Sequence, residues 1–129
     1  MAFNRIIPSE HQEQCRVIAW ADAMSRRFPD LWLLHAIPNA GKRTPVTGSR
    51  MKKEGLRRGV PDLDLPVSRG TYIGLRIEMK KIEGGDLKDP DQMEWQRRLA
   101  LAGHCVVVCK GADAAIKVIE WYLKSEWKP

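Results

Sequence analysis

The chain has 129 residues, 43% of them hydrophobic, and its 22 Lys and Arg against 16 Asp and Glu give a formal net charge of +6. This length fits a single domain, spanning residues 1–129, around one core. No apolar run approaches the ~20 residues that cross a bilayer, and the first residues lack the pattern of a secretion signal. We therefore expect a cytoplasmic protein without a membrane partner.

The first predicted element is a helix. Ser9 followed by Gln12 forms a capping-box pattern, and apolar residues then recur at helical spacing up to Phe28, before Pro29. Glu10 lies on the same side of this helix as the apolar residues. The first turn is thus expected to direct a carboxylate toward the protein.

A strand, a short helix and a hairpin are predicted next. The apolar run at 31–37 indicates a strand, and residues 49–55 fit a short capped helix. Two further strands, at 60–65 and 71–82, are joined by a turn at 66–70.

The two hairpin strands alternate between apolar and ionisable residues. The apolar face of the second strand, which we expect to be buried, consists of Ile73, Leu75, Ile77 and Met79. Its other face carries Arg76, Glu78 and Lys80, and the first strand presents Asp62 and Asp64 in the same way.

A helix, a strand and a last helix complete the chain. Asp89 is placed to cap a helix that carries Gln92 in its first turn and stops at Gly103. The run at 104–109 is typical of a fully buried strand, and residues 112–123 fit a helix. The resulting order, α-β-β-β-α-β-α, predicts an α/β fold around one mixed sheet flanked by helices.

The cysteines do not indicate a metal or redox site. Cys15, Cys105 and Cys109 show no Cys-x-x-Cys spacing, and the last two are too far apart along a strand for a disulfide. We expect three buried small side chains.

The positive charge is concentrated in residues 39–59. This segment holds seven Lys and Arg against one acid and so accounts for the whole net charge of +6. Its basic residues are Lys42, Arg43, Arg50, Lys52, Lys53, Arg57 and Arg58. Such a local excess favours a polyanionic partner, although a solvated loop is the alternative.

The hairpin predicts a site for a hard cation. Adjacent antiparallel strands would bring Asp62, Glu78 and Lys80 to one face. Carboxylates without Cys or His suit Mg²⁺ or Mn²⁺, which can promote phosphodiester hydrolysis, and Lys80 could orient the attacking water. The alternative is a set of cross-strand ion pairs with no catalytic role.

The motifs together resemble a known family. They are SEHQEQ at 9–14, GVPDL at 59–63, EMK at 78–80, the Asp91-Gln92-x-x-Trp95 pattern and AGH at 102–104. They are similar to the VRR-NUC branch of the PD-(D/E)xK nuclease superfamily, in its standalone, phage-type form. A phage protein of this kind would act in the host cell cytoplasm.

The resemblance implies a fold and a set of site residues. The fold would be restriction-endonuclease-like, with an α-β-β-β-α-β core and a C-terminal helix. The metal would be held by Asp62, Glu78 and the backbone carbonyl of Met79, with Glu10 as a further candidate ligand. Lys80 would be catalytic, and Glu10 and Gln92 would complete the site.

The implied activity is that of a metal-dependent, structure-selective DNA endonuclease for branched DNA, such as a Holliday-junction resolvase, with no small-molecule cofactor. Two symmetric nicks require a homodimer, for which the apolar stretch at 121–127 is a candidate contact. The alternatives are a flap or nicking nuclease, a non-catalytic DNA-binding module, and an RNA-directed or restriction-type nuclease on the same fold.

Overall fold

A computed structural model describes residues 6–38 and 45–124, with side chains from residue 49 onward in the second range. The elements in order are α1 (Glu10–Met24), the 3₁₀ helix η1 (Pro29–Leu33), β1 (His35–Ala36), α2 (Pro45–Lys53), β2 (Leu63–Leu65), β3 (Leu75–Lys80), α3 (Pro90–Leu101), β4 (Cys105–Lys110) and α4 (Ala112–Lys124). Within these ranges no helix has the combination of length and apolar character needed to cross a membrane.

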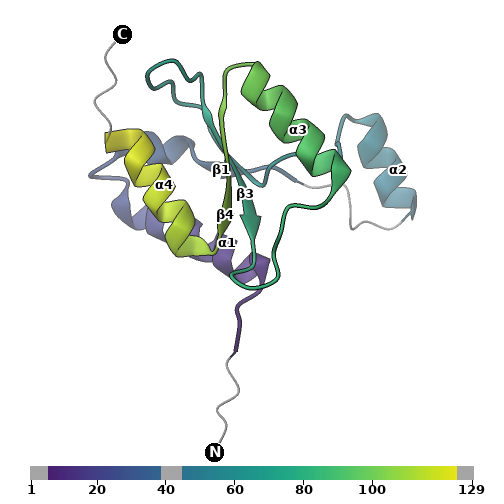
Figure 1. Ribbon diagram of the computed structural model, residues 1–129, viewed down its shortest axis with the longest axis horizontal. Coiled ribbons are helices and arrows are strands. Elements are labelled where there is room, and N and C mark those ends of the chain that lie inside the picture. Colours follow the sequence, from purple (N-terminus) through teal and green to yellow (C-terminus); the bar gives the residue numbers. More distant parts are fainter. Residues whose placement is uncertain (1–5, 39–44, 125–129) are drawn as a thin grey trace, which may run out of the picture.

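The strands form one mixed sheet in the order β1-β2-β3-β4. β1 and β2, like β2 and β3, pair antiparallel, whereas β3 and β4 are parallel because α3 connects them. Helices α1 and α4 contact each other and one face of the sheet, and α3 lies against the opposite face (Figure 1). The predicted α/β fold with a mixed sheet flanked by helices is confirmed.

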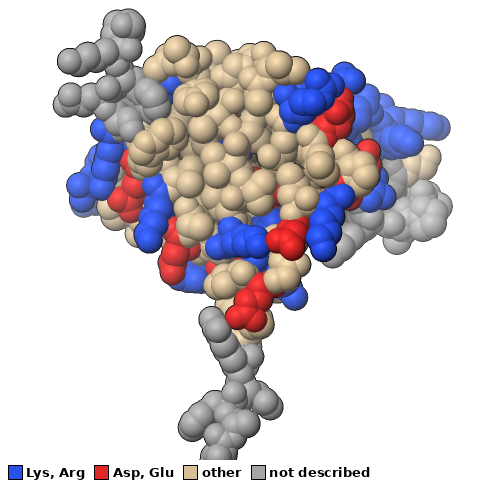
Figure 2. All heavy atoms as spheres, in the orientation of Figure 1, with Lys and Arg blue, Asp and Glu red and all other residues tan. Residues whose placement is uncertain are grey.

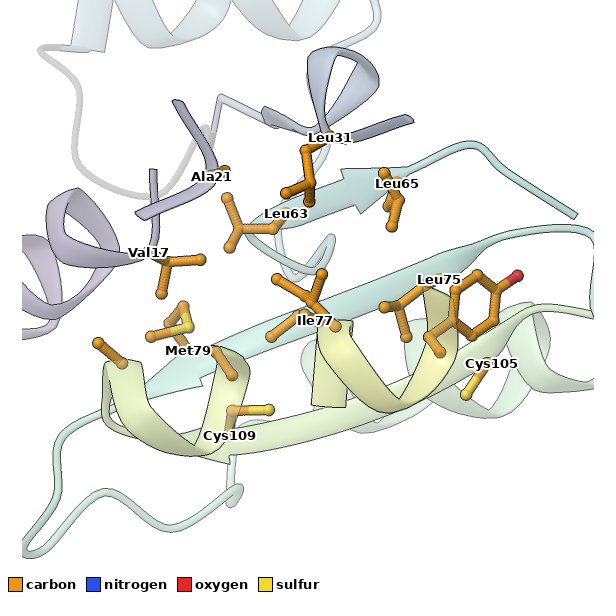
Figure 3. Close-up of a cluster of buried hydrophobic side chains, with 14 of the residues drawn as sticks. Val17, Ala21, Leu31, Leu63, Leu65, Leu75, Ile77, Met79, Cys105 and Cys109 are labelled. Carbon is orange, nitrogen blue, oxygen red and sulfur yellow. The ribbon is translucent and has the colours of Figure 1, made fainter. Parts of the chain in front are cut away.

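The hydrophobic core lies between the sheet and the α1–α4 pair (Figure 3). β3 contributes Leu75, Ile77 and Met79, and the neighbouring strands add Leu63, Leu65, Cys105 and Cys109. The helices add Val17 and Ala21 from α1 and Ala112, Ala115, Ile119 and Tyr122 from α4. This apolar face of the sheet is continuous from β2 to β4. Because side chains alternate along a strand, the remaining side chains of β2 and β3 must point to the opposite face.

The helix starts follow the predicted caps. Ser9 and Gln12 form a capping box at α1, and the Asp89 carboxylate accepts the N–H of Gln92 at 3.3 Å at the start of α3. α3 ends at Leu101, and Gly103 adopts a φ of +108°, which suits glycine.

The prediction of a strand at 31–37 is wrong for most of its length. A 3₁₀ turn begins at Pro29 and buries Leu31, while Trp32 is 84% exposed. Hydrogen bonds of the i→i+3 type hold this turn, including Leu34 N–H to the Leu31 carbonyl at 3.1 Å. Only His35–Ala36 is left to pair with β2 as β1.

The hairpin strands are shorter than predicted. Arg69 and Tyr72 exchange backbone hydrogen bonds of 2.9–3.0 Å and so close a turn inside the expected second strand. β3 consequently starts at Leu75, and Ile73, expected in the core, is 55% exposed.

Two burial predictions also need correction. β4 is an edge strand, so only Cys105 and Cys109 of its residues are buried and the strand is not fully enclosed. Cys15 lies on the outer side of α1 and is exposed. Glu78, on the charged face of β3, is buried as well.

Candidate active site

Asp62 and Glu78 meet because of the register between β2 and β3. Leu63 pairs with Ile77, so the next antiparallel position places Asp62 beside Glu78. Asp62 is fixed there, since its carbonyl accepts the Ile37 N–H at 2.8 Å and its carboxylate accepts the Met79 N–H at 2.7 Å. The two carboxyl groups thus face the same end of the sheet.

Lys80 lies among acidic and polar groups at this end. Its ammonium is 3.5 Å from Glu78 Oε1 and 4.0 Å from Glu10 Oε1, and it donates a hydrogen bond to Gln92 Oε1 at 2.9 Å. The side chain is only 12% exposed. The structure therefore brings together Asp62, Glu78, Lys80, Glu10 and Gln92, which come from the residue before β2 and from β3, α1 and α3.

Burial dominates the electrostatics of the acid pair. It raises the pKa of Glu78 to about 8, aided by the Asp62 charge and opposed by Lys80. Burial also raises the pKa of Asp62, against the lowering effect of the Met79 N–H, while Glu10 adds to the increase. Two acids in these positions do not ionise together readily without a further positive charge.

The donor set fits a hard cation bound with waters. Glu78 Oε2 is buried and has no hydrogen-bond partner among the described residues. A hydrogen bond between the Glu78 and Asp62 carboxyl groups forms only while one of the two acids keeps a proton. The Met79 N–H and carbonyl belong to the same strand residue and face the same edge of β3, toward Asp62. Carboxylates with a carbonyl are suitable ligands for Mg²⁺ or Mn²⁺.

The described side chains at this site do not by themselves surround a metal ion. Across residues 6–38 and 49–124, no three His, Cys, Asp or Glu side chains lie close enough to hold a metal ion together. Mg²⁺ is commonly bound by one or two carboxylates with water and substrate phosphate supplying the rest, so the Asp62–Glu78 pair suffices. Glu10 contacts Lys80, and its assignment as a ligand stays a prediction.

The site opens into a cleft of about 660 Å³. Glu10, Asp62 and Gln92 line it, together with His11, Gln14, Lys81, Arg58, Gly59, Ser9 and Asp89. Sequence reasoning did not assign His11, Gln14 or Lys81 to the site. Gln14 lies one helical turn after Glu10 and Lys81 follows Lys80, and these two positions are signals that could have identified them, whereas no spacing pointed to His11.

Part of the basic segment lies beside this cleft. Arg58 lines it and is held 3.7 Å from Asp89 and 3.8 Å from Asp91, at the start of α3. Arg50, Lys52, Lys53 and Arg57 are exposed on and after α2, where Lys and Arg gather at the right of the view (Figure 2). Lys42 and Arg43 lie outside the described residues.

Asp64 does not join the site and instead forms ion pairs within the sheet. It lies 3.1 Å from Arg76 Nε and 3.6 Å from His35 Nε2, its cross-strand neighbours. The ion-pair alternative was considered for Asp62, Glu78 and Lys80; Asp64 and Arg76 form such a cross-strand pair outside the site.

Comparison with known proteins identifies the family. No protein-family model and no curated protein matches the chain. Among solved structures, a VRR_NUC domain protein superposes with a TM-score of 0.76 at 34% identity, over 95% of this chain and 92% of that one. A second structure, named VRR_NUC domain, has a TM-score of 0.51 at 27% identity, over 85% and 97% of the two chains. The chain belongs to the VRR_NUC domain family and is a nuclease domain with a restriction-endonuclease-like fold.

Proposed function

We propose that this nuclease domain is a metal-dependent, structure-selective DNA endonuclease that hydrolyses phosphodiester bonds in branched DNA, including four-way Holliday junctions. The observation that carries the proposal is the pairing of the buried Glu78 with the half-buried Asp62, with Lys80 beside them. Burying two neighbouring carboxyl groups is costly unless a cation compensates them. Lys80 contacts Glu78 at 3.5 Å, but Glu78 Oε2 still lacks a donor among the described residues.

Asp62, Glu78 and the Met79 carbonyl are the groups that would hold Mg²⁺ or Mn²⁺. When bound, such an ion supplies a more acidic water and neutralises charge on the phosphate. The protein's own contribution is to fix the donor geometry. The 2.7 Å hydrogen bond from the Met79 N–H holds the Asp62 carboxylate, and the β2–β3 register holds Glu78 beside it.

Lys80 is the group that acts on the reacting phosphate. Its ammonium is compact and can orient the attacking water or stabilise negative charge as it develops. Gln92 accepts a hydrogen bond from it at 2.9 Å, and Glu10 approaches it to 4.0 Å. These two side chains, from separate helices, limit the positions that the ammonium can take.

The basic residues around α2 would bind the DNA backbone. Arg58 lines the cleft, and Arg50, Lys52, Lys53 and Arg57 extend the positive surface away from it. Contacts to phosphates position DNA without reading its sequence. A nuclease that selects DNA by shape requires contacts of this type.

A homodimer would supply the second nick. The middle of the face in Figure 2, between α4 and α3, is largely free of Lys, Arg, Asp and Glu. Of the exposed apolar side chains, Leu101 ends α3, Trp121 lies on α4 and Ile73 precedes β3. Such a patch supports an isologous contact between two copies. If the protein stays monomeric on a junction, the flap or nicking nuclease is the better description.

The direct test is cleavage of labelled linear, splayed, flapped and four-way DNA with Mg²⁺, Mn²⁺ or a chelator. We expect cutting of branched substrates in preference to linear DNA, and only with a divalent ion. Equal cutting of linear DNA would remove the structure selectivity. Binding to DNA without any cutting would leave the non-catalytic module, and preferential cutting of matched RNA would identify an RNA-directed nuclease.

A further inference from the structure

Glu13 is a buried carboxylate that has no role in the proposed reaction. It lies on α1, three residues after Glu10, and its exposed fraction is 0%. Its Oε2 accepts the backbone N–H of Ala112 at 2.6 Å, and its Oε1 lies 3.1 Å from Arg16. Because a buried carboxylate needs partners, these two contacts fix its orientation.

The contact with Ala112 joins α1 to the start of α4. Ala112 is the first residue of α4, and its N–H belongs to the group that has no partner within a helix. A carboxylate at this end also interacts favourably with the helix dipole. Gly111, with a φ of +88°, makes the approach possible, since a Cβ there would lie 2.8 Å from Glu13 Oε2.

The same junction continues to the catalytic strand. The Gly111 N–H donates a hydrogen bond to the Lys80 carbonyl at 3.0 Å, and Lys110 pairs with Lys80 in the β3–β4 register. Thus Glu13 on α1 holds Ala112, and the adjacent Gly111 is hydrogen-bonded to Lys80, the last residue of β3. Arg16, which contacts Asp113 at 3.1 Å, adds a second connection on the surface.

We propose that Glu13 is a positioning residue that holds the first turn of α1 against the end of β3, so that Glu10 stays beside Lys80. Glu13 acts through Ala112 and Gly111 and does not touch the substrate. The inference rests on the proposed nuclease function, because Glu10 and Lys80 act in that reaction. It adds to the site a residue that lies outside its cleft.

The test compares Glu13→Ala and Glu13→Gln with Tyr122→Phe. The control removes another buried hydrogen bond of α4, from the Tyr122 hydroxyl to the Val67 carbonyl, away from the cleft. In each variant we would measure single-turnover cleavage of a four-way junction at saturating Mn²⁺ and hydrogen exchange of the Gly111 amide in the metal-free protein. All measurements use a temperature at which thermal unfolding shows every variant folded.

We expect Glu13→Ala to cut between about 10- and 100-fold more slowly, the range that small misplacements of reacting groups produce, with unchanged junction affinity. Its Gly111 amide should exchange faster than in the wild type. Glu13→Gln keeps an acceptor but loses the charge, so its rate and exchange should fall between those of Glu13→Ala and the wild type. Tyr122→Phe should match the wild type in both.

A wild-type cutting rate or wild-type Gly111 exchange in folded Glu13→Ala would overturn the inference, as would equal slowing by Tyr122→Phe. If Glu13→Ala does not fold, Glu13→Gln decides, and wild-type values in both measurements reject the positioning role. A wild-type protein that cuts no DNA would refute the proposed function instead. Exchange at Gly111 would still report whether Glu13 holds the junction.

Discussion

At the scale of single residues, Glu78 combines burial with a neighbouring acid. It is 3% exposed, lies beside Asp62 in the strand register and has its pKa raised to about 8. In the folded, metal-free protein it therefore keeps a proton at pH values where the unfolded chain has lost it. This difference makes the stability of the fold depend on pH.

We expect the metal-free protein to lose stability as the pH rises. Below the unfolded pKa of 4.5 both states hold the proton. Between there and about 8 the unfolded state alone releases it, so stability falls, and above about 8 the loss levels off. Each pKa unit corresponds to about 1.4 kcal/mol, so the loss from Glu78 is on the order of a few kcal/mol.

Urea unfolding in chelator at about pH 5.5 and about pH 8.5 measures this loss, with Glu78→Gln as the comparison. Glu78→Gln should flatten the dependence, since it cannot ionise. An equally steep fall in that variant would show that another group is responsible.

Gln92 offers a second test at this scale. Gln92→Ala removes the acceptor 2.9 Å from the Lys80 ammonium and frees that side chain, so we expect slower cutting, by about 10-fold. Gln96→Ala on the same helix is the matched control and should cut like the wild type, because Lys80 bonds Gln92 and the Gln96 Nε2 has no hydrogen-bond partner among the described residues. Equal rates for the two variants in a single-turnover assay would exclude a role for Gln92 in holding Lys80.

At the scale of elements, Gly59 sets how closely the chain before β2 approaches α3. Its φ is +87°, and a Cβ there would lie 2.7 Å from the backbone carbon of Asp91 and 2.8 Å from the Gln92 nitrogen. Contacts this short with backbone atoms cannot be relieved by a side-chain rotation. Gly59 therefore fixes the spacing between the segment that carries Asp62 and the helix that carries Gln92.

Gly55 supplies the matched control. It has a φ of +104° with no atom within 4 Å of an added Cβ, so Gly55→Ala introduces only backbone strain, about 1–2 kcal/mol. Gly59→Ala adds the clash with α3 and should lower both Tm and cutting rate further. If Gly59→Ala is as stable and as active as Gly55→Ala, the close approach is not required.

The elements also show what sequence patterns can predict. The Asp62–Glu78 hairpin could be predicted because strict alternation fixes the faces and a short connection favours pairing. The apolar run at 31–37 could not be assigned correctly, since periodicity alone does not distinguish a short strand from a helical turn. Glu13 was missed because its partner is 99 residues away in the sequence, at the start of another helix.

At the scale of the whole molecule, the basic residues proposed to bind DNA lie apart from the acids proposed to hold the metal ion. Lys and Arg gather over α2 (Figure 2), while Asp62 lies just before β2 and the buried Glu78 lies on β3. Substitutions on α2 should therefore alter affinity for DNA without altering the reaction. Substitutions of the acids should have the opposite effect.

We expect Lys52→Ala combined with Lys53→Ala to weaken junction binding and to lower the salt slope of log Kd by about 1 for each DNA phosphate that the variant no longer neutralises. The control, Lys117→Ala with Lys124→Ala on α4, removes the same charge elsewhere. Binding isotherms at several salt concentrations give the slopes. Identical slopes for the two double variants would mean that α2 does not contact the backbone.

The most direct test of the acid pair compares the wild type with Asp62→Asn on a labelled four-way junction in saturating Mn²⁺. We predict that the wild type cuts and that Asp62→Asn binds the junction equally well. We also predict that Asp62→Asn cuts more than about 100-fold more slowly than the wild type. Substituting even a residue that only hydrogen-bonds to a metal ligand typically lowers metal affinity or activity by about 10- to 100-fold. An Asp62→Asn protein that cuts at the wild-type rate would contradict the account.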